Sequence, residues 1–200
     1  MKFTITKPNQ TLLNLLILLT LTSCLSNKKI TIKEEQELEK NYEQVGLQYL
    51  SDAQKVLAGN LISSIQKQGT VKAIEFCNIN AIPLTEEVSK KHNAKIKRAT
   101  DKPRNQDNKA SSQELIQILN FKDQILNNKQ ISPTIIKSKE KVNFYFPIIT
   151  NSMCLQCHGT TQDITPSVKS KIHELYPKDI AIGYKENQVR GIWSIEFINY

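Results

Sequence analysis

Three features of the sequence predict an α+β fold in which helices come first and a small antiparallel sheet follows. In the first part of the chain, apolar residues recur at the spacing of amphipathic helices. After Asn127, apolar and polar residues alternate as they do in half-buried strands, most clearly from Val142 to Phe146. A Cys-x-x-Cys-His motif at residues 154–158 follows that strand directly. The length fits one domain, residues 32–200, behind an N-terminal export segment.

The first predicted element is a long helix. Thr31 and Glu34 stand at the spacing of a capping box, in which each side chain satisfies a backbone N–H of the other end of the turn. The apolar face then continues to about Lys67 through Leu38, Tyr42, Val45, Tyr49, Ala53 and Val56. Gly69 is expected to stop the helix.

Three shorter helices are predicted behind it. The first covers residues 71–77 and carries Cys77 on its apolar side. The second covers residues 84–91, because Pro83 suits the first turn of a helix. The third starts at a serine cap, Ser111 or Ser112, and runs to about Leu126.

The last part of the chain predicts one more helix and a hairpin. Residues 167–176 indicate the helix. Residues 181–184 and 189–197 indicate two strands joined by the polar residues 185–188, and Trp193, Ile195 and Phe197 alternate with polar neighbours in the second. The predicted sheet therefore receives the segment with the Cys-x-x-Cys-His motif.

Cys154, Cys157 and His158 form the most informative motif of the chain. This spacing is typical of covalent c-type haem attachment, in which the two thiols bond the haem and the histidine is the proximal iron ligand. A redox dithiol and half of a zinc site are the alternatives. Neither a βαβ pattern around the motif nor a second pair of zinc ligands is visible in the sequence. The motif therefore favours one covalent haem c.

The N-terminus indicates export, which suits c-type haem. Lys2 and Lys7 precede an apolar run over residues 12–21, and small residues then lead to Cys24. This pattern resembles a bacterial lipobox, which implies a signal peptide over residues 1–23, a lipid on Cys24 and a tether over residues 24–31. A transmembrane anchor is the alternative to a lipoprotein signal peptide. The apolar run is shorter than the roughly twenty residues that a membrane-spanning helix needs. We expect a protein anchored by lipid in the cell envelope and facing the periplasm, at the outer membrane because Leu25 is not acidic.

The charge distribution and the number of cysteines limit which classes of partner the sequence predicts. The formal net charge is +8, but Lys and Glu are interspersed rather than gathered in one basic block. Together with export, this excludes nucleic acid as the expected partner and favours membrane lipid and an unidentified redox or signalling protein. With Cys24 lipidated and two cysteines on haem, Cys77 remains unpaired. In an oxidising compartment such a thiol needs burial or a metal.

Several segments occur in the order found in one known family. They are Ala73 to Cys77, Lys97 to Thr100, Arg104-Asn105, Asn108, Cys154 to Gly159, Asp179 to Tyr184, and Arg190-Gly191. The chain resembles the PAS-like c-type-haem family of formerly unknown function, which includes a cyanobacterial haem protein of the thylakoid lumen and extracytoplasmic input domains of sensor kinases. The resemblance implies a PAS-like sheet with a covalently bound c-type haem. The family usually has Pro after the Arg-Asn pair, where this chain has Gln106.

The resemblance also implies that Cys77 is the distal iron ligand. From the residues alone, Met153, His92 and His173 compete for that role, and a buried inert thiol is the alternative for Cys77. Met153 is too close to the attachment site to cross the ring, and both histidines lie in charged helical stretches.

Arg98 and Arg104 are the candidates for contacts with the haem propionates, because guanidinium groups match carboxylates. A role on the surface or in loop structure is their alternative. Arg190-Gly191 is expected to shape the predicted hairpin.

Two functions fit these features. The first is a redox or small-ligand sensor, in which a displaceable thiolate changes the protein conformation. The second is a single-haem periplasmic electron-transfer cytochrome. An enzyme is not expected, because a peroxidase needs an open distal site with a positioned acid-base group, and a thiol-capped haem closes it.

Overall fold

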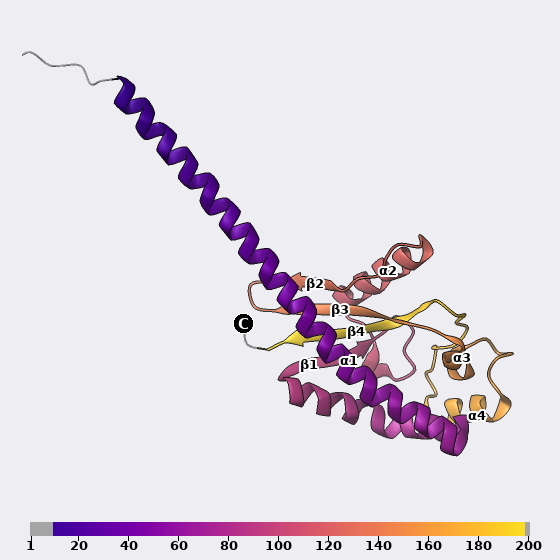
Figure 1. Cartoon of the computed structure of the whole chain (residues 1–200). Helices are drawn as coiled ribbons and strands as arrows, with labels where there is room; N and C mark the ends of the chain where they lie inside the picture. The colour runs from indigo at the N-terminus through magenta and orange to yellow at the C-terminus, as the bar shows by residue number, and fades with distance from the viewer. Residues whose placement is uncertain (1–9, 199–200) are drawn as a thin grey trace, which may run out of the picture. The chain divides into compact units, whose positions relative to one another are not determined.

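The computed structural model describes the backbone of residues 10–198 and the side chains of residues 34–198. The chain divides into two compact units, Met1–Asn41 and Tyr42–Tyr200. The described part of the first unit is helical. The second unit contains the sheet and the remaining helices (Figure 1).

The predicted export signal lies partly outside this description. Lys2 and Lys7 precede the first described residue, and the side chain of Cys24 is not among those described. Within the described residues, no helix combines the length and the apolar composition of a membrane span.

Helix α1 covers Gln10–His92 and bends sharply at Gly69, whose backbone angles of φ 82° and ψ 169° lie outside the helical region. Glycine adopts such a positive φ without steric cost. The prediction that Gly69 stops the first helical arm is confirmed. The predicted start at Thr31 is wrong, and residues 24–31, expected as a tether, are helical. Neither glycine nor proline stands between residues 10 and 41 to interrupt the helix.

The second arm of α1, residues 70–92, is one helix rather than the two predicted over residues 71–77 and 84–91. Pro83 lies inside this arm. Its missing N–H would have bonded the carbonyl of Ile79, and both residues are exposed, so water can satisfy that carbonyl. The proline is therefore tolerated without a break.

Four antiparallel strands form one sheet in the order β1-β4-β3-β2. The strands are β1 (Ala94–Ala99), β2 (Thr134–Lys137), β3 (Val142–Ile149) and β4 (Val189–Phe197). The predictions of β3 and β4 are confirmed. The strands β1 and β2 were not predicted, although Ile96 alternates with lysines in β1.

The predicted hairpin over residues 181–184 and 189–197 is wrong, because residues 181–184 form no strand. Gly183 has a φ of 81°, which breaks the extended conformation. The backbone of this segment bonds the end of α3 (Ser152–His158) instead: Gly183 N–H donates to the Gly159 carbonyl, and Tyr184 N–H donates to the His158 carbonyl.

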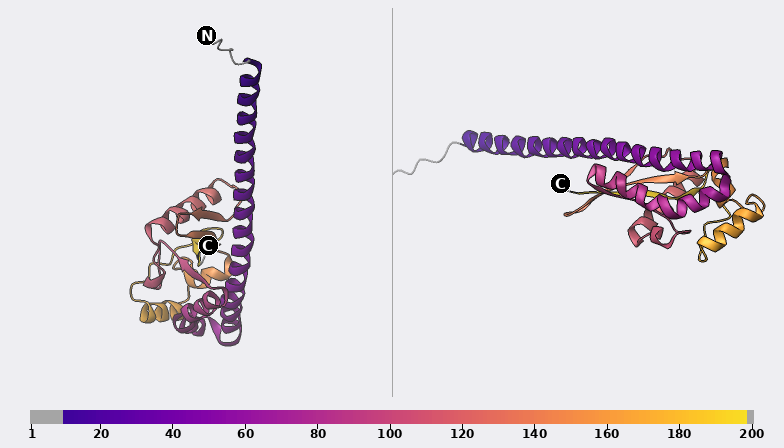
Figure 2. Two further views of the ribbon diagram at one scale, coloured as in Figure 1. Left: turned by 90° about the vertical axis from the view of Figure 1, so that its left-hand side faces the viewer. Right: turned by 90° about the horizontal axis from the view of Figure 1, so that it is seen from below.

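Helices cover both faces of the sheet, α1 on one and α2 (Ser112–Leu126) on the other (Figure 2). Side chains of successive strand residues point to opposite faces, so Phe144 packs under α1 while Tyr145 packs under α2. The prediction of α2 is confirmed, including its cap at Ser111, where Ser111 and Glu114 form a capping box. The two layers bury Leu50, Ala53, Ile96, Trp193 and Ile195 on the first face, and Ala99, Ile118, Phe121 and Ile192 on the second.

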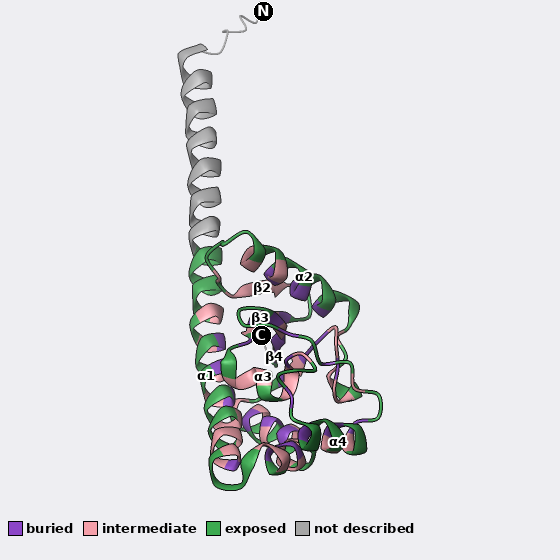
Figure 3. Ribbon diagram, turned by 90° about the vertical axis from the view of Figure 1, so that its right-hand side faces the viewer, coloured by how far each residue is buried: buried purple, intermediate pink, exposed green. Residues whose placement is uncertain are grey.

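A third apolar cluster lies at the end of the sheet, where the second arm of α1 meets α4 (Pro166–Leu175). Its buried members are Ile74, Ile164, Val168, Ile172 and Tyr176. Figure 3 shows α4 beside the second arm of α1, with each residue coloured by its burial. The prediction of α4 over residues 167–176 is confirmed to within one residue at each end. This cluster supports the segment with the Cys-x-x-Cys-His motif.

We expect Gly46→Ala to destabilise the protein. A Cβ at position 46 would lie 2.3 Å from Cδ2 of Phe144, a fully buried ring with no room to withdraw. Overpacking of this kind costs about 1–3 kcal/mol, which urea denaturation would measure. Gly59→Ala is the matched control, because nothing lies within 4 Å of that position, and this change should stabilise the helix by about 0.5–1 kcal/mol. Equal effects of the two changes would contradict the close packing of α1 on the sheet.

Candidate functional site

Helix α3 presents the Cys-x-x-Cys-His motif directly after β3. Thr150 ends the strand by pairing its backbone with residues 187 and 188. Asn151 then caps α3, and its side-chain oxygen accepts the N–H of Cys154 at 3.3 Å. Gly159 closes the helix, because a Cβ there would lie 2.6 Å from the Leu155 carbonyl oxygen. The cap and the closing glycine thus fix a short helix that holds all three motif side chains.

The two motif cysteines share one side of α3, because residues three apart in a helix are neighbours. Cys154 and Cys157 are both half-buried and free. Cys157 packs against the apolar cluster that contains Ile74 of the second arm of α1. Burial raises the pKa of Cys157 to about 11, the Arg104 guanidinium opposes this, and Cys77 adds to it.

Cys77 follows Ile74 by one turn on the second arm of α1, so it faces the same region as Cys157. It is a free, half-buried thiol. Burial raises the pKa of Cys77, and the positive charges of Arg98 and Arg104 oppose the rise. The structure therefore brings Cys77, Cys157 and two predicted arginines into one neighbourhood.

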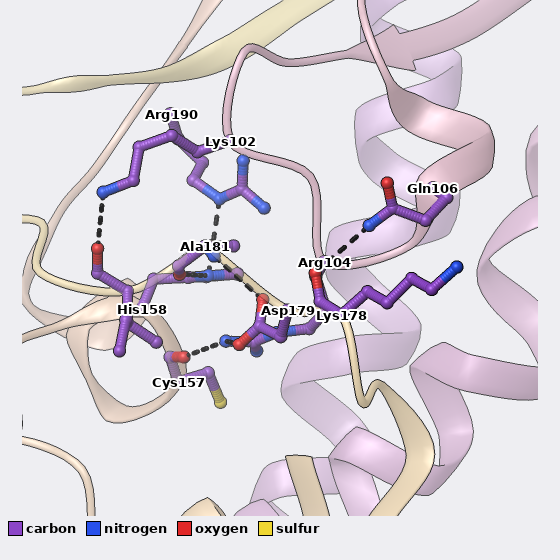
Figure 4. Close-up of polar contacts among 10 residues, drawn as sticks. Lys102, Arg104, Gln106, Cys157, His158, Lys178, Asp179, Ala181 and Arg190 are labelled. Atoms are coloured by element: carbon purple, nitrogen blue, oxygen red, sulfur yellow. Dashed lines mark hydrogen bonds and ion pairs between the residues drawn. The ribbon is translucent and has the colours of Figure 1, made fainter. Parts of the chain in front are cut away.

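His158 is held by the segment over residues 179–184, which crosses the end of α3 (Figure 4). Its Nδ1 lies 2.7 Å from the Ala181 carbonyl oxygen. A carbonyl only accepts, so this contact places a proton on Nδ1 and leaves Nε2 as a bare nitrogen donor. Burial, then the charges of Arg190 and Arg104, hold the pKa of His158 well below its usual value. A neutral imidazole with a bare Nε2 is the form that ligates a metal.

Arg104 lies inside the site. Its Nη2 donates to the Cys157 carbonyl at 2.5 Å and to Asp179 Oδ2 at 3.2 Å, and the two charged side chains are only 10% and 8% exposed. Asp179 Oδ1 also accepts the N–H of Ala181 at 2.9 Å. The buried pair thus ties α3 to the segment that holds His158, while Nε of Arg104 is buried without a partner in the structure.

Arg98, in β1, reaches the same region. Its Nε is buried and has no hydrogen-bond partner in the structure. Burial lowers the pKa of Arg98, and Cys77 is the largest opposing influence. A buried guanidinium nitrogen without a partner requires an acceptor, which a carboxylate supplies well.

Arg190, which the sequence reasoning assigned to a hairpin, is a site residue. Its Nε lies 3.3 Å from Nδ1 of His158, and its Nη1 donates to Oγ1 of Thr100 at 2.7 Å. Its guanidinium stands over the Tyr184 ring, 5.4 Å from the centroid. Arg190-Gly191 is one of the segments on which the family resemblance rests, and this could have indicated a site residue. The incorrect prediction of a hairpin led to its assignment to a structural role.

The other ligand candidates lie in different surroundings. His92 ends the second arm of α1, where it contacts Asp52 at 2.8 Å and stacks on Tyr49. His173 is exposed on α4, and Met153 precedes Cys154 on α3. Within residues 34–198, no three His, Cys, Asp or Glu side chains are arranged to hold a metal ion.

The residues present fit a c-type haem. Two free cysteines and a neutral histidine lie on one short helix, a second thiol faces the same region, and two buried guanidinium groups there have unpartnered nitrogens. A porphyrin supplies four of the iron ligands itself, so one imidazole and one thiol from the protein complete the set.

The fold and the site define a small α+β domain with a Cys-x-x-Cys-His helix beside a four-stranded sheet. The sequence profile of the Tll0287-like family matches residues 21–197. The chain belongs to this family. Its fold is similar to the crystal structure of the cyanobacterial haem protein Tll0287, with a TM-score of 0.58 and 22% identity over 82% of this chain and 96% of that chain. No curated protein matches the chain.

We expect Asp179→Ala to destabilise the site. The change leaves the buried Arg104 charge without its ion pair and removes the acceptor of the Ala181 N–H. Breaking a buried ion pair in this way costs about 3–5 kcal/mol, measurable by urea denaturation. Glu174→Ala is the control, because its pair with Lys171 lies on the surface and should contribute little to stability. If both variants unfold at the same urea concentration, the Arg104–Asp179 pair does not stabilise this region.

Proposed function

We propose that this protein is a membrane-tethered, extracytoplasmic c-type haem protein that acts as a redox or small-ligand sensor. One observation supports the proposal most strongly. Nδ1 of His158 is engaged by the Ala181 carbonyl, which leaves Nε2 bare on the same short helix as two free cysteines. Membership of the Tll0287-like family adds support, because the protein for which the family is named is a haem protein.

In this proposal each site residue has a defined role. Cys154 and Cys157 form the thioether bonds, and His158 is the proximal iron ligand. Cys77 is the distal ligand. When bound, the haem supplies a one-electron redox centre and an iron position that a small ligand can occupy.

Arg98 and Arg104 are proposed to hold the haem propionates. Each has a buried Nε without a partner, and a carboxylate would satisfy it. Arg104 uses Nη2 for Asp179 and Cys157, and its buried Nε remains available for this contact.

The sensor role is supported by the positions of the two residues that are proposed to ligate the iron. His158 is on α3 with both attachment cysteines, whereas Cys77 is on the second arm of α1, a different element. Loss of the Cys77 contact would therefore leave the haem covalently attached, and it would change the contacts of the second arm of α1. This separation suits a ligand that is displaced and rebound. We do not propose an enzyme, because ligation by Cys77 would close the distal site that a peroxidase needs open.

Electron transfer is the alternative function. The segment that holds His158 has two exposed apolar side chains, Ile180 and Ile182, on either side of Ala181. Only one layer of backbone separates this exposed surface from the imidazole. A redox protein docked there would be close to the haem ligand, so a capped haem with a fixed distal ligand would serve as a carrier.

The optical spectrum of the haem-loaded protein distinguishes the two functions. We expect Cys77→Ala to keep the covalent haem but to change the ferric absorption and EPR spectra, because a thiolate ligand is lost. Met153→Leu is the matched control and should leave both spectra unchanged. Unchanged spectra in Cys77→Ala would contradict ligation by Cys77. A Cys154→Ser/Cys157→Ser variant should carry no covalent haem.

Carbon monoxide then reports on the distal position. In the dithionite-reduced wild-type protein, a prompt spectral shift under carbon monoxide would show that Cys77 leaves the iron, as a sensor requires. An unchanged spectrum would show a capped haem and would favour electron transfer.

The location is proposed from the N-terminus. A lipid on Cys24 would anchor the protein in the cell envelope, facing the periplasm and at the outer membrane, with membrane lipid and a separate redox or signalling protein as partners. Two or three acyl chains, at about 0.8 kcal/mol per buried CH₂, hold a protein stably on a membrane.

We expect Cys24→Ser to abolish incorporation of labelled palmitate. The lipid-anchored form should then disappear from the membrane fraction, and the protein should be found as a soluble form or as uncleaved precursor. Ser26→Ala, a nearby change outside the lipobox, should leave labelling intact. Labelled Cys24→Ser protein would show that the anchor is elsewhere.

A further inference from the structure

We propose that Arg190 is a positioning residue for His158 that fixes the orientation of the imidazole and limits its electron donation to iron. This inference rests on the proposed haem ligation by His158. It concerns a residue for which the sequence indicated only a structural role in a hairpin.

The guanidinium of Arg190 is held from three sides. Nη1 donates to Oγ1 of Thr100 at 2.7 Å, and the group lies over the ring of Tyr184 at 5.4 Å. Nε then faces Nδ1 of His158 at 3.3 Å. Because Thr100, Tyr184 and His158 belong to three different segments, the guanidinium has little freedom to leave the imidazole edge.

The backbone also fixes the start of this side chain. Arg190 is the second residue of β4, and its carbonyl accepts the hydroxyl of Thr100 at 2.8 Å. The next residue is Gly191, where a Cβ would lie 2.4 Å from the Ala99 carbonyl oxygen. The glycine therefore permits β4 to run close to the end of β1, where Arg190 contacts Thr100, and the pairing of β4 with β3 brings Arg190 toward α3 and His158.

Nδ1 of His158 faces two partners with opposite demands. The Ala181 carbonyl at 2.7 Å accepts a proton, whereas the Nε–H of Arg190 at 3.3 Å offers one. With Nε2 ligating a metal, the proton must be on Nδ1, where Ala181 accepts it. Arg190 then supplies a fixed positive charge beside that N–H.

A fixed positive charge at this position has a definite electronic effect. A carboxylate partner at the second nitrogen pulls the proton away and makes a histidine ligand more basic. Arg190 does the opposite, because a cation opposes the build-up of negative charge on the ring. His158 is thus a weaker electron donor to the iron, and the ferrous state is stabilised relative to the ferric state.

Other charges near His158 do not cancel this effect. Arg104 and Arg98 are also close enough to influence the imidazole, and both are positive. Asp179 is paired with Arg104 and bonds the Ala181 backbone. Arg190 differs from them in that its Nε lies 3.3 Å from the ring nitrogen Nδ1 itself.

The test compares reduction potentials of the haem-loaded proteins. We expect Arg190→Gln to make the potential more negative than in the wild type and to change the ferric EPR g-values, because the ring loses both its neighbouring charge and its restraint. Arg190→Lys keeps the charge and should recover part of the potential shift. Lys102→Gln is the matched control: its Nζ donates to the Ile182 carbonyl at 2.6 Å and lies 4.7 Å from the Tyr184 ring centroid, but the residue does not contact His158.

A larger negative shift in Arg190→Gln than in Lys102→Gln, with partial recovery in Arg190→Lys, supports the proposal. Equal shifts in Arg190→Gln and Lys102→Gln would overturn it, because the effect would then be one of general charge. If Arg190→Gln does not fold, a wild-type-like potential in Arg190→Lys, with altered g-values, supports the proposal, and a large shift there overturns it. A wild-type protein without covalent haem would overturn the proposed function itself, which separates the two failures.

Discussion

The arrangement of the candidate site depends on the hydrogen bond between Nδ1 of His158 and the Ala181 carbonyl. It sets the tautomer of the imidazole and therefore decides which nitrogen is available as a donor. Two backbone hydrogen bonds, from Gly183 and Tyr184 to the end of α3, hold the same segment in place. The site is consequently built from a loop laid across a helix end, and the sheet supplies the rigid base beneath it.

Around this bond the protein gathers positive charge. Arg98, Arg104 and Arg190 come from β1, the following loop and β4, and Asp179 pairs with Arg104. Guanidinium groups removed from water cost free energy unless anions compensate them. A group with two carboxylates, such as haem, would offset that cost if the arginines bind it as proposed. Binding of such a group would then also stabilise the protein around these arginines.

Much of this arrangement follows from the sequence, because strong local signals agreed with tertiary structure. The Ser111 and Glu114 capping box starts α2, and the alternation in residues 142–146 lies in β3. Where tertiary contacts overrode local signals, the predictions failed. Residues 181–184 had the composition of a strand, but Gly183 and the bonds to α3 make them a loop. Pro83 predicted a helix start, but its exposure allows one continuous arm.

The sequence shows the motif residues of the candidate site, but it does not show the geometry around them. Cys154, Cys157 and His158 are adjacent in sequence, so their spacing alone indicates the chemistry. Arg190 is distant from His158 in the chain, and the pairing of β4 with β3, which leads into α3, brings the two together. No periodicity encodes such a contact, because it depends on the register of strands.

The bend at Gly69 divides α1 into two arms and places Cys77 in the second of them. Cys77 follows the bend closely, and the arm before it leads back through α1 toward the N-terminus. If Cys77 leaves the iron, as the proposed sensor role requires, the second arm that carries it is joined to the first arm through this bend. The bend depends on a backbone conformation that only glycine adopts freely.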